Sequence, residues 1–177
     1  MKLPITHYGN PILRKRGEPV AEITAEIRAL AANMVETMEA ADGVGLAAPQ
    51  VGCPLRLFVM REVIVGVDGV VTSKPAEVIL NPTFSKPSYE QETMQEGCLS
   101  LPGLYLDIDR PASIHVRYQT LEGDFREEHL TGFRARVFMH ENDHINGVLF
   151  FDRLPAAERK LLHAVLQEIK QTYAQEY

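Results

Sequence analysis

The sequence predicts an α+β fold in which mostly antiparallel β-sheets pack around a central helix, with one further helix towards each end of the chain. Three observations predict it: an amphipathic segment near the amino terminus, a middle region of short β-type runs, and a return to helical patterns after residue 130. With 177 residues, 45% of them hydrophobic, the chain can bury a sizeable core. We therefore expect a single domain over residues 1–177.

The first helix is predicted from apolar residues at helical spacing that follow a possible cap at Thr24. We expect it to end around Asp42 and Gly43. The apolar stripe indicates a face packed on the core, and its members are Ile23, Ile27, Leu30, Met34 and Met38.

Short runs of β-branched and aromatic residues, separated by Pro and Gly, predict several strands in the middle of the chain. Between the first two, Asp68-Gly69 suits a tight turn, so residues 61–76 are expected to form a surface hairpin. The three predicted strands are Leu55–Met60, Glu77–Leu80 and Ser113–Tyr118.

Two helical patterns close the sequence. The first runs from Thr131 to about Asn146, with Gly147 placed to stop it. The second is expected to begin at Pro155 and to continue as one helix, with an apolar face made of Leu162, Val165, Leu166, Ile169 and Tyr173.

Composition excludes some functions. The net charge of −6 and the absence of long Lys and Arg runs argue against direct nucleic-acid specificity. No signal-like segment follows Met1, and no membrane-length apolar run occurs, so a cytoplasmic protein without membrane contact is expected. In that compartment Cys53 and Cys98 are expected to be reduced thiols rather than a disulfide.

Residues 140–144 read His-Glu-Asn-Asp-His, an H-E-x-x-H pattern inside a predicted helix. Two histidines four residues apart lie on one helical face, so both can reach one metal ion, and the glutamate beside them can approach its water. Phe133 and Val137 continue the same face, which predicts that the two histidines lie on the buried side. A solvated helix face with no metal is the alternative.

A catalytic site of this kind usually takes a third protein ligand. His163 and Glu168 lie downstream, where zinc peptidases commonly find theirs, whereas Cys98 lies upstream after Gly97. Glycine allows the chain to approach a ligand closely, although an isolated cysteine is more often a small buried residue. Residues 43–50 are too rich in small residues for a core strand, and we expect backbone there to lie against a substrate.

These three segments together resemble the peptide deformylase family, which carries the motifs G-x-G-L-A-A-x-Q, E-G-C-L-S and Q-H-E-x-D-H in this order. They correspond here to Gly43–Gln50, Glu96–Ser100 and His140–His144, and the likeness covers nearly the whole chain, including the bacterial form's C-terminal helix. The resemblance implies hydrolysis of the N-terminal formyl group of formyl-methionyl nascent polypeptides, with release of formate. Formyl-Met peptides are the implied partners, together with a possible transient ribosome contact.

The resemblance also implies roles for individual residues. Cys98, His140 and His144 become the metal ligands, and Glu141 becomes the general acid and base. The Gln50 amide and the Leu99 backbone N–H would stabilise the oxyanion. One divalent ion per chain is implied, with Fe²⁺ as the native metal and Ni²⁺, Co²⁺ or Zn²⁺ as substitutes.

In the family, bound peptide lies along the counterpart of Gly45 as an added strand, and its first side chain fills a pocket. The substrate-binding residues implied here are Val44, Gly45, Gly97, Phe133, Arg136 (through its aliphatic stem) and Val137. Two positions depart from the family pattern: Met139 replaces the commoner Gln, and Tyr105 stands where some relatives have Arg.

Three questions stay open from the sequence. Glu96 and Arg110 could form a buried ion pair that supports the cysteine loop, or could be two surface charges. A zinc peptidase with His163 or Glu168 as third ligand is the competing enzyme. A metal-binding or ribosome-associated module without catalysis is the competing non-enzyme.

Overall fold

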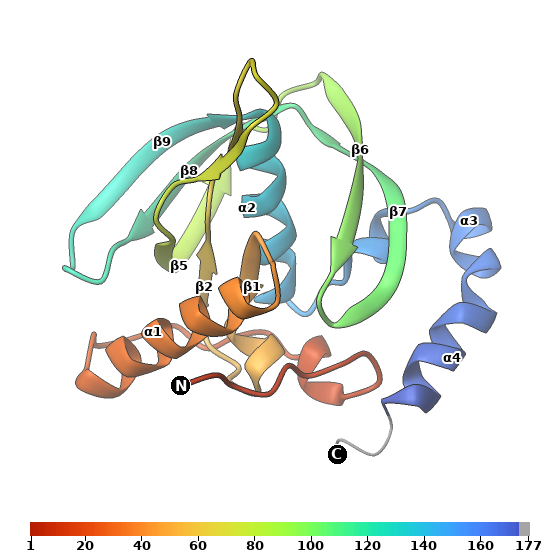
Figure 1. Cartoon of the computed structure of the whole chain (residues 1–177), viewed down its shortest axis with the longest axis horizontal. Helices are drawn as coiled ribbons and strands as arrows, with labels where there is room; N and C mark the ends of the chain where they lie inside the picture. Colours follow the sequence, from red (N-terminus) through yellow and green to blue (C-terminus); the bar gives the residue numbers. More distant parts are fainter. Residues whose placement is uncertain (174–177) are drawn as a thin grey trace.

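The structure is a computed structural model of the chain and describes residues 1–173. Helix α2 (Gly132–His144) runs through the middle of the molecule, with a five-stranded sheet on one side and the long β6–β7 hairpin on the other (Figure 1). Every strand pairing among the described residues is antiparallel, apart from one isolated bridge between Glu18 and Leu55. The α+β prediction, with antiparallel sheets around a central H-E-x-x-H helix, is confirmed.

The larger sheet has the strand order β1-β2-β5-β8-β9, so β1 and β9 form its two edges. Three of its strands were expected from sequence, and β1 and β9 were not. The strands are β1 (Gly45–Ala47), β2 (Leu57–Met60), β5 (Glu77–Ser85), β8 (Ser113–Gln119) and β9 (Phe125–Thr131).

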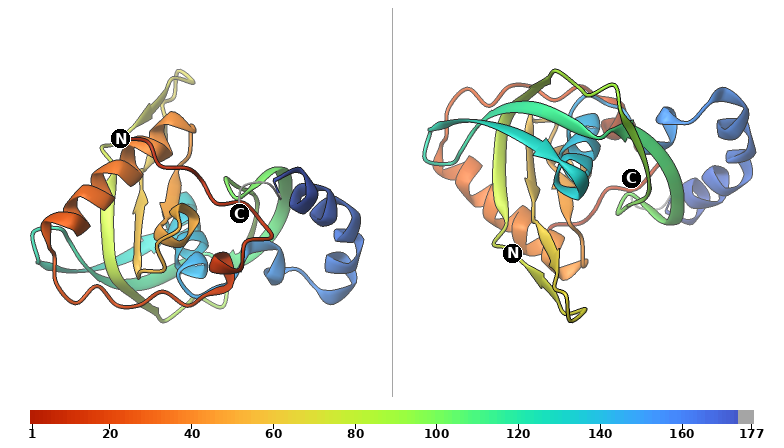
Figure 2. Two further views of the ribbon diagram at one scale, coloured as in Figure 1. Left: turned by 90° about the horizontal axis from the view of Figure 1, so that it is seen from below. Right: turned by 90° about the horizontal axis from the view of Figure 1, so that it is seen from above.

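Two hairpins complete the β-structure. The expected hairpin over 61–76 is present as β3 (Val63–Val65) and β4 (Val71–Ser73), which project from the body of the protein (Figure 2). The second hairpin, β6 (Gln91–Cys98) with β7 (Leu101–Pro111), was not predicted. β6 is mostly polar and only partly buried, so it lacks the hydrophobic alternation that identifies a strand. β7 does alternate, with Leu104, Leu106 and Ile108 on one side, and that pattern was overlooked.

The described residues form four α-helices where the sequence predicted three. Helix α1 (Ala25–Ala40) begins at Thr24, whose side chain accepts a hydrogen bond from the Ile27 amide. The last helical region is divided into α3 (Ala156–Leu161) and α4 (His163–Thr172), with the break at Leu162, so the prediction of one continuous helix was wrong. The described part of α4 nevertheless buries Leu166 and Ile169. No described helix is long and apolar enough to cross a membrane.

The core positions α2 relative to both β-layers. Phe58 and Phe138 meet edge to face between the five-stranded sheet and α2. Helix α1 covers β1 and β2 through Met34 and Met38. A third cluster joins β7 to the C-terminal helices around Ile108 and several neighbours. Core side chains therefore hold α2, which carries the histidines, and the end of β6, which carries Cys98, in the interior.

Candidate active site

Helix α2 places its two histidines inside the protein, as the sequence predicts. His140 and His144 are both buried, and their ring centroids lie 5.1 Å apart. Val137, one turn earlier, is also buried. Phe133 departs from the prediction: its side chain is 44% exposed, and it lines the cavity described below rather than the core.

Cys98 approaches these histidines from the end of β6. The register of the β6–β7 hairpin shifts between Gly97 and Cys98, and Cys98 Sγ lies 3.3 Å from His144 Nε2. The ligand atoms of Cys98, His140 and His144 all lie within 4.8 Å of one another. Among the described residues, no other group of three such side chains meets this condition.

The alternative third ligands do not join this group. His163 and Glu168 lie exposed on α4, at the outer side of the β6–β7 hairpin and away from α2 (Figure 1). The zinc-peptidase hypothesis with either residue as ligand is therefore wrong. Both cysteines are free thiols, as expected.

Glu96 connects the cysteine hairpin to the helix. Its carboxylate accepts hydrogen bonds from Arg110 Nε at 2.7 Å and Arg136 Nη1 at 2.9 Å, and its Oε1 lies 2.8 Å from His140 Nδ1. All four side chains are buried, so the buried ion pair between Glu96 and Arg110 is confirmed. Since Glu96 occupies Nδ1 of His140, the Nε2 atom is the one left to face Cys98.

Arg110 extends this network to the second histidine's neighbour. Its Nη1 donates to Asp143 Oδ2 at 2.8 Å, and Asp143 also accepts from Arg153. The network was missed from sequence beyond the first pair, because Asp143 lies 33 residues from Arg110. Arg110 thus binds Glu96, two residues before Cys98, and also Asp143, the residue before His144.

Electrostatic effects follow from this burial. Burial would raise the pKa of Glu96, but hydrogen bonds from His140 and Arg110 outweigh it and hold that pKa far below its usual range. Burial would lower the pKa of His140, yet its contacts with Cys98 and Glu96 raise that pKa well above the ordinary value. Burial lowers the pKa of His144, and the neighbouring His140 adds to the effect. Cys98 and Glu96 therefore favour a positive charge at His140, whereas burial favours the neutral form of His144.

Glu141 lies beside the ligand group with one oxygen unpaired. Its side chain is buried, and Oε2 has no hydrogen-bond partner among the described residues. Burial raises the pKa of Glu141 to about 7. A Cβ atom at Gly45 would lie 2.8 Å from Glu141 Cγ, so only glycine fits there without a shift of the carboxylate.

Gly45 belongs to β1, which corrects one expectation. We predicted that residues 43–50 would not form a core strand, yet Gly45–Ala47 is a fully buried strand at the sheet edge. Small residues can form a buried strand here because α2 packs directly against β1, with Glu141 against Gly45. The outer edge of β1 remains without a strand partner among the described residues.

Gln50 is held in one orientation after this strand. Its Oε1 accepts a hydrogen bond from the Ala47 amide at 2.8 Å, so its Nε2 donates towards Ser100 Oγ at 3.1 Å and lies 3.7 Å from Cys98 Sγ. The amide is buried and directed at the ligand group.

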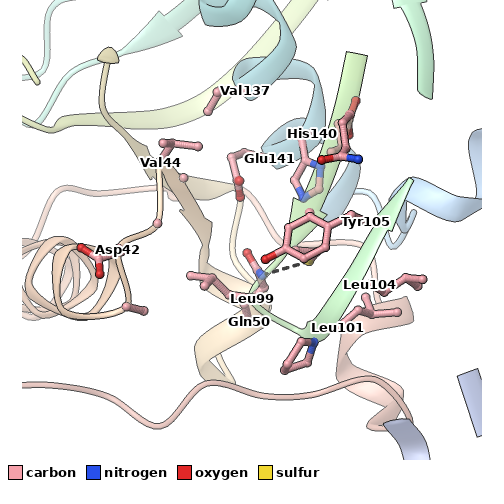
Figure 3. A pocket seen from close by; sticks show the side chains of 18 of the residues that line it. Asp42, Val44, Gln50, Leu99, Leu101, Leu104, Tyr105, Val137, His140 and Glu141 are labelled. Atoms are coloured by element: carbon pink, nitrogen blue, oxygen red, sulfur yellow. Dashed lines mark hydrogen bonds and ion pairs between the residues drawn. The ribbon is translucent and has the colours of Figure 1, made fainter. Parts of the chain in front are cut away.

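A cavity of about 540 Å³ opens onto these groups. Glu141, His140 and Gln50 face the same space, and the ring of Tyr105 lies beside it (Figure 3). Of the site residues predicted from sequence, only His144 does not line the cavity. Those that do are Val44, Gly45, Gln50, Gly97, Cys98, Leu99, Phe133, Arg136, Val137, His140 and Glu141.

The cavity wall also contains residues that sequence reasoning missed or described incompletely. Asp42, Leu101 and Leu104 line it without any motif to mark them. Arg136 lines it too, but its guanidinium is tied to Glu96 and to the Ile108 carbonyl, so the aliphatic stem is the part left for the cavity.

The donor set fits a metal ion. A thiol and two imidazoles converge, and a buried carboxylate oxygen beside them lacks a partner among the residues that the structure describes. Cys98, His140 and His144 suit a single divalent ion with one position left for water.

Comparisons with known proteins agree with this geometry. The family model described as Polypeptide deformylase matches residues 2–160. The peptide deformylase of Thermotoga neapolitana is 46% identical over 162 residues, 92% of this chain and 93% of that protein. The crystal structure of peptide deformylase from Thermus thermophilus is 42% identical, with a TM-score of 0.86 over 97% of this chain and 99% of that one.

A third relative has a bound peptide. The Met-Ala-Ser-bound crystal structure of a class I type b peptide deformylase from Acinetobacter baumannii is 34% identical, with a TM-score of 0.80. It covers 87% of this chain and 99% of its own. With a family model over most of its length and close relatives of matching length, the chain belongs to the peptide deformylase family, the metallo-hydrolases that remove the N-formyl group from nascent peptides.

Proposed function

We propose that this chain deformylates formyl-methionyl nascent polypeptides with Glu141 as the proton carrier and with Gln50 and Leu99 as donors to the oxyanion. The observation that carries the proposal is the buried Oε2 of Glu141, unpaired among the described residues, beside the ligand group of Cys98, His140 and His144. Such a carboxylate is costly to bury unless a proton or a polar partner reaches it during the reaction. A divalent ion held by the three ligands would act as a Lewis acid and lower the pKa of a water molecule there.

Glu141 is suited to take and return one proton. Its raised pKa, about 7, lies close to neutral pH, where a group exchanges protons in both directions most effectively. In the proposed sequence Glu141 accepts a proton from the attacking water. It then donates that proton to the amine of methionine as the bond to the formyl carbon breaks. Formate and a free amino terminus are the products.

Gln50 would stabilise the developing negative charge on the formyl oxygen. Because its Oε1 is fixed by the Ala47 amide, its Nε2 needs no reorganisation to donate. Leu99, directly after Cys98, would add its backbone N–H from the other wall. One donor of this kind typically contributes about 3 to 4 kcal/mol to lowering the barrier.

The open edge of β1 would hold the peptide backbone. The Val44 carbonyl accepts from the Arg61 amide, so along an antiparallel ladder the next residue, Gly45, directs its amide groups away from β2. A peptide could therefore add as a strand at Gly45. The methionine side chain would enter the pocket of Val44, Phe133 and Val137, with Gly97 and the stem of Arg136 completing its wall. The peptide-bound relative supports this substrate class.

The identity of the metal and the cellular site of action follow as part of the same proposal. Fe²⁺ is the proposed native ion, and Ni²⁺, Co²⁺ or Zn²⁺ would replace it. Nascent chains would be met in the cytoplasm, and a transient ribosome contact stays a prediction.

Replacement of Glu141 tests the proposed role. Glu141→Ala should keep a full complement of metal, since the three ligands are intact, yet release formate from formyl-Met-Ala-Ser at least about 100-fold more slowly. Metal analysis of the same sample separates loss of proton transfer from loss of the ion. Turnover near the wild-type rate in the metal-loaded variant would contradict the proposal, and absence of turnover in the wild type would favour a non-catalytic module.

A further inference from the structure

The β3–β4 hairpin carries an exposed apolar surface that the proposed reaction does not use. Its aliphatic side chains point outward rather than into a core: Val65 is 67% exposed and its direct cross-strand partner Val71 is 64% exposed. The exposed members are Ile64, Val65, Val67, Val70 and Val71. Val65 and Val71 lie side by side on one face, whereas Ile64 points to the other, and adjacent exposed apolar side chains of this kind can mark an interaction surface.

The hairpin also has an unpaired backbone edge. β3 pairs with β4 alone among the described residues, and its other edge offers amide and carbonyl groups to a further strand. Proteins commonly protect such edges with inward charges or proline, because an open edge recruits other extended chains. β3 and β4 read Val63-Ile64-Val65 and Val71-Thr72-Ser73, without charge or proline, so their shortness is the protection that this edge has.

The chain connects this edge to the substrate groove. The Glu62 carbonyl accepts from the Lys74 amide, so the β3–β4 pair continues the β2–β5 pair with β3 following β2. β1 lies on the side of β2 opposite β5, so the free edge of β3 is on the same side as β1. Figure 1 shows the hairpin rising above the loop that joins α1 to β1, away from α1 itself.

Hydrogen bonds join the base of the hairpin to the wall of the cavity. Arg61 donates its backbone amide to the Val44 carbonyl at 2.9 Å and its Nε to the Gly43 carbonyl at 2.8 Å. Both acceptor residues line the cavity. Glu141 packs against Gly45, and Gln50 lies beyond the far end of β1, so a peptide that starts level with Gly45 and leads away from these groups would run past Gly43 towards the hairpin.

The strand register indicates which residues of the substrate would lie level with β3. Gly45 pairs with Met60, and Val63 to Val65 follow three to five residues later along the same ribbon. With the first peptide residue level with Gly45 in an extended peptide, β3 lies level with about the fourth to sixth residues. The outer edge of β1 lies one strand, about 4.8 Å, farther out than the free edge of β3, so the peptide must step inward beyond Gly43, outside the span of β1, to reach β3.

We propose that the outer edge of β3, with the Val65–Val71 pair, binds an extended apolar segment of the substrate about four to six residues after the formylated methionine. This inference rests on the proposed function. An unfolded nascent chain has unpaired backbone groups, which can pair with the free edge of β3, and apolar side chains, which can pack on Val65 and Val71. Self-association is the weaker candidate, because strands of three residues bury far less than the roughly 1,200 Å² of a stable dimer.

The test compares two octapeptides, formyl-Met-Ala-Ser followed by either three valines or three threonines and then two lysines. Valine and threonine have nearly the same shape, so the comparison isolates apolar burial. We expect the wild type to favour the valine peptide by about fivefold in kcat/KM, as burial of roughly one extra methyl-sized group requires. The double variant Val65→Thr/Val71→Thr should bring this ratio to about one.

Two controls make the result specific. The variant should hydrolyse formyl-Met-Ala-Ser at the wild-type rate, because the tripeptide ends before the hairpin. Val67→Thr makes the same change at the tip, outside both strands, and should keep the preference.

Equal kcat/KM of the wild type for both octapeptides, or an unchanged preference in the double variant, would overturn the proposal. A double variant that differs from the wild type in sedimentation and not in peptide preference would assign the surface to a second copy and overturn it too. No formate from the tripeptide with the wild type would instead refute the proposed function.

Discussion

Substitution of Gly45 by alanine should damage catalysis by moving one carboxylate. A methyl group at this position would lie 2.7 Å from Glu141 Cδ and 2.8 Å from Cγ, where ordinary contacts begin near 3.4 Å. The carboxyl group would therefore have to move by roughly 0.7 Å or more. Both partners are buried, on a sheet strand and on the central helix, so neither backbone can yield easily.

The expected cost is about 100-fold in kcat, because a displacement approaching 1 Å typically costs that much in an oriented site. Crowding should also lower the free energy of unfolding by about 1 to 3 kcal/mol. The assay is formate release from formyl-Met-Ala-Ser at saturating peptide, with metal content measured on the same protein. Metal should stay bound, since Gly45 touches none of the three ligands in the contacts described.

Gly43→Ala supplies the graded comparison. Its methyl group would meet Leu99 Cδ1 at 3.0 Å and both Cγ and the carbonyl oxygen of Met38 at 3.3 Å, so it is less crowded than a methyl group at Gly45. We expect a loss in kcat below about tenfold. Full metal and a kcat within about threefold of wild type for Gly45→Ala would refute the reasoning, and so would equal losses for the two glycine variants.

Three further outcomes follow from the site. Cys98→Ala should lose metal and nearly all activity whereas Cys53→Ala keeps both, and elemental analysis with a turnover assay would show an error if Cys98→Ala stayed loaded and active. Arg110→Met should lower the free energy of unfolding in urea by about 3 to 5 kcal/mol, because Glu96 and Asp143 would lose a buried cation; a change under about 1 kcal/mol would contradict this. The iron-loaded enzyme should lose activity in air faster than the nickel-loaded enzyme, and equal half-lives at equal metal content would count against a thiolate-bound ferrous centre.

Local patterns allowed the helical half of the site to be predicted. The spacing of His140, Glu141 and His144 fixes their relative positions once the segment is helical, and helical periodicity is visible in about a dozen residues. The first helix and the strands β2, β5 and β8 were predicted for the same reason. The first helix and β8 bury one side against a core, and β2 is a continuous apolar run buried on both sides, so each carries a hydrophobic pattern visible in the sequence.

The other half depended on contacts that no local pattern records. Strands β6 and β9 have mainly exposed or polar side chains, so no alternation marks them. Strand β1 contains only three small residues, and its burial comes from α2 packing on it rather than from large apolar side chains. The break between α3 and α4 at Leu162 falls inside a continuous apolar periodicity, which is why one helix was expected.

The charge network explains how two unrelated segments form one site. Cys98 comes from a hairpin and His144 from a helix, and neither element alone would hold the thiol 3.3 Å from the imidazole. Arg110 lies on β7, opposite Glu92 in the hairpin register, and reaches both Glu96 on β6 and Asp143 on α2. The hairpin and the helix are therefore joined by buried hydrogen bonds that do not pass through the ligand atoms. Since buried ion pairs contribute little net stability compared with apolar packing, their value here lies in fixing one relative position of the two elements.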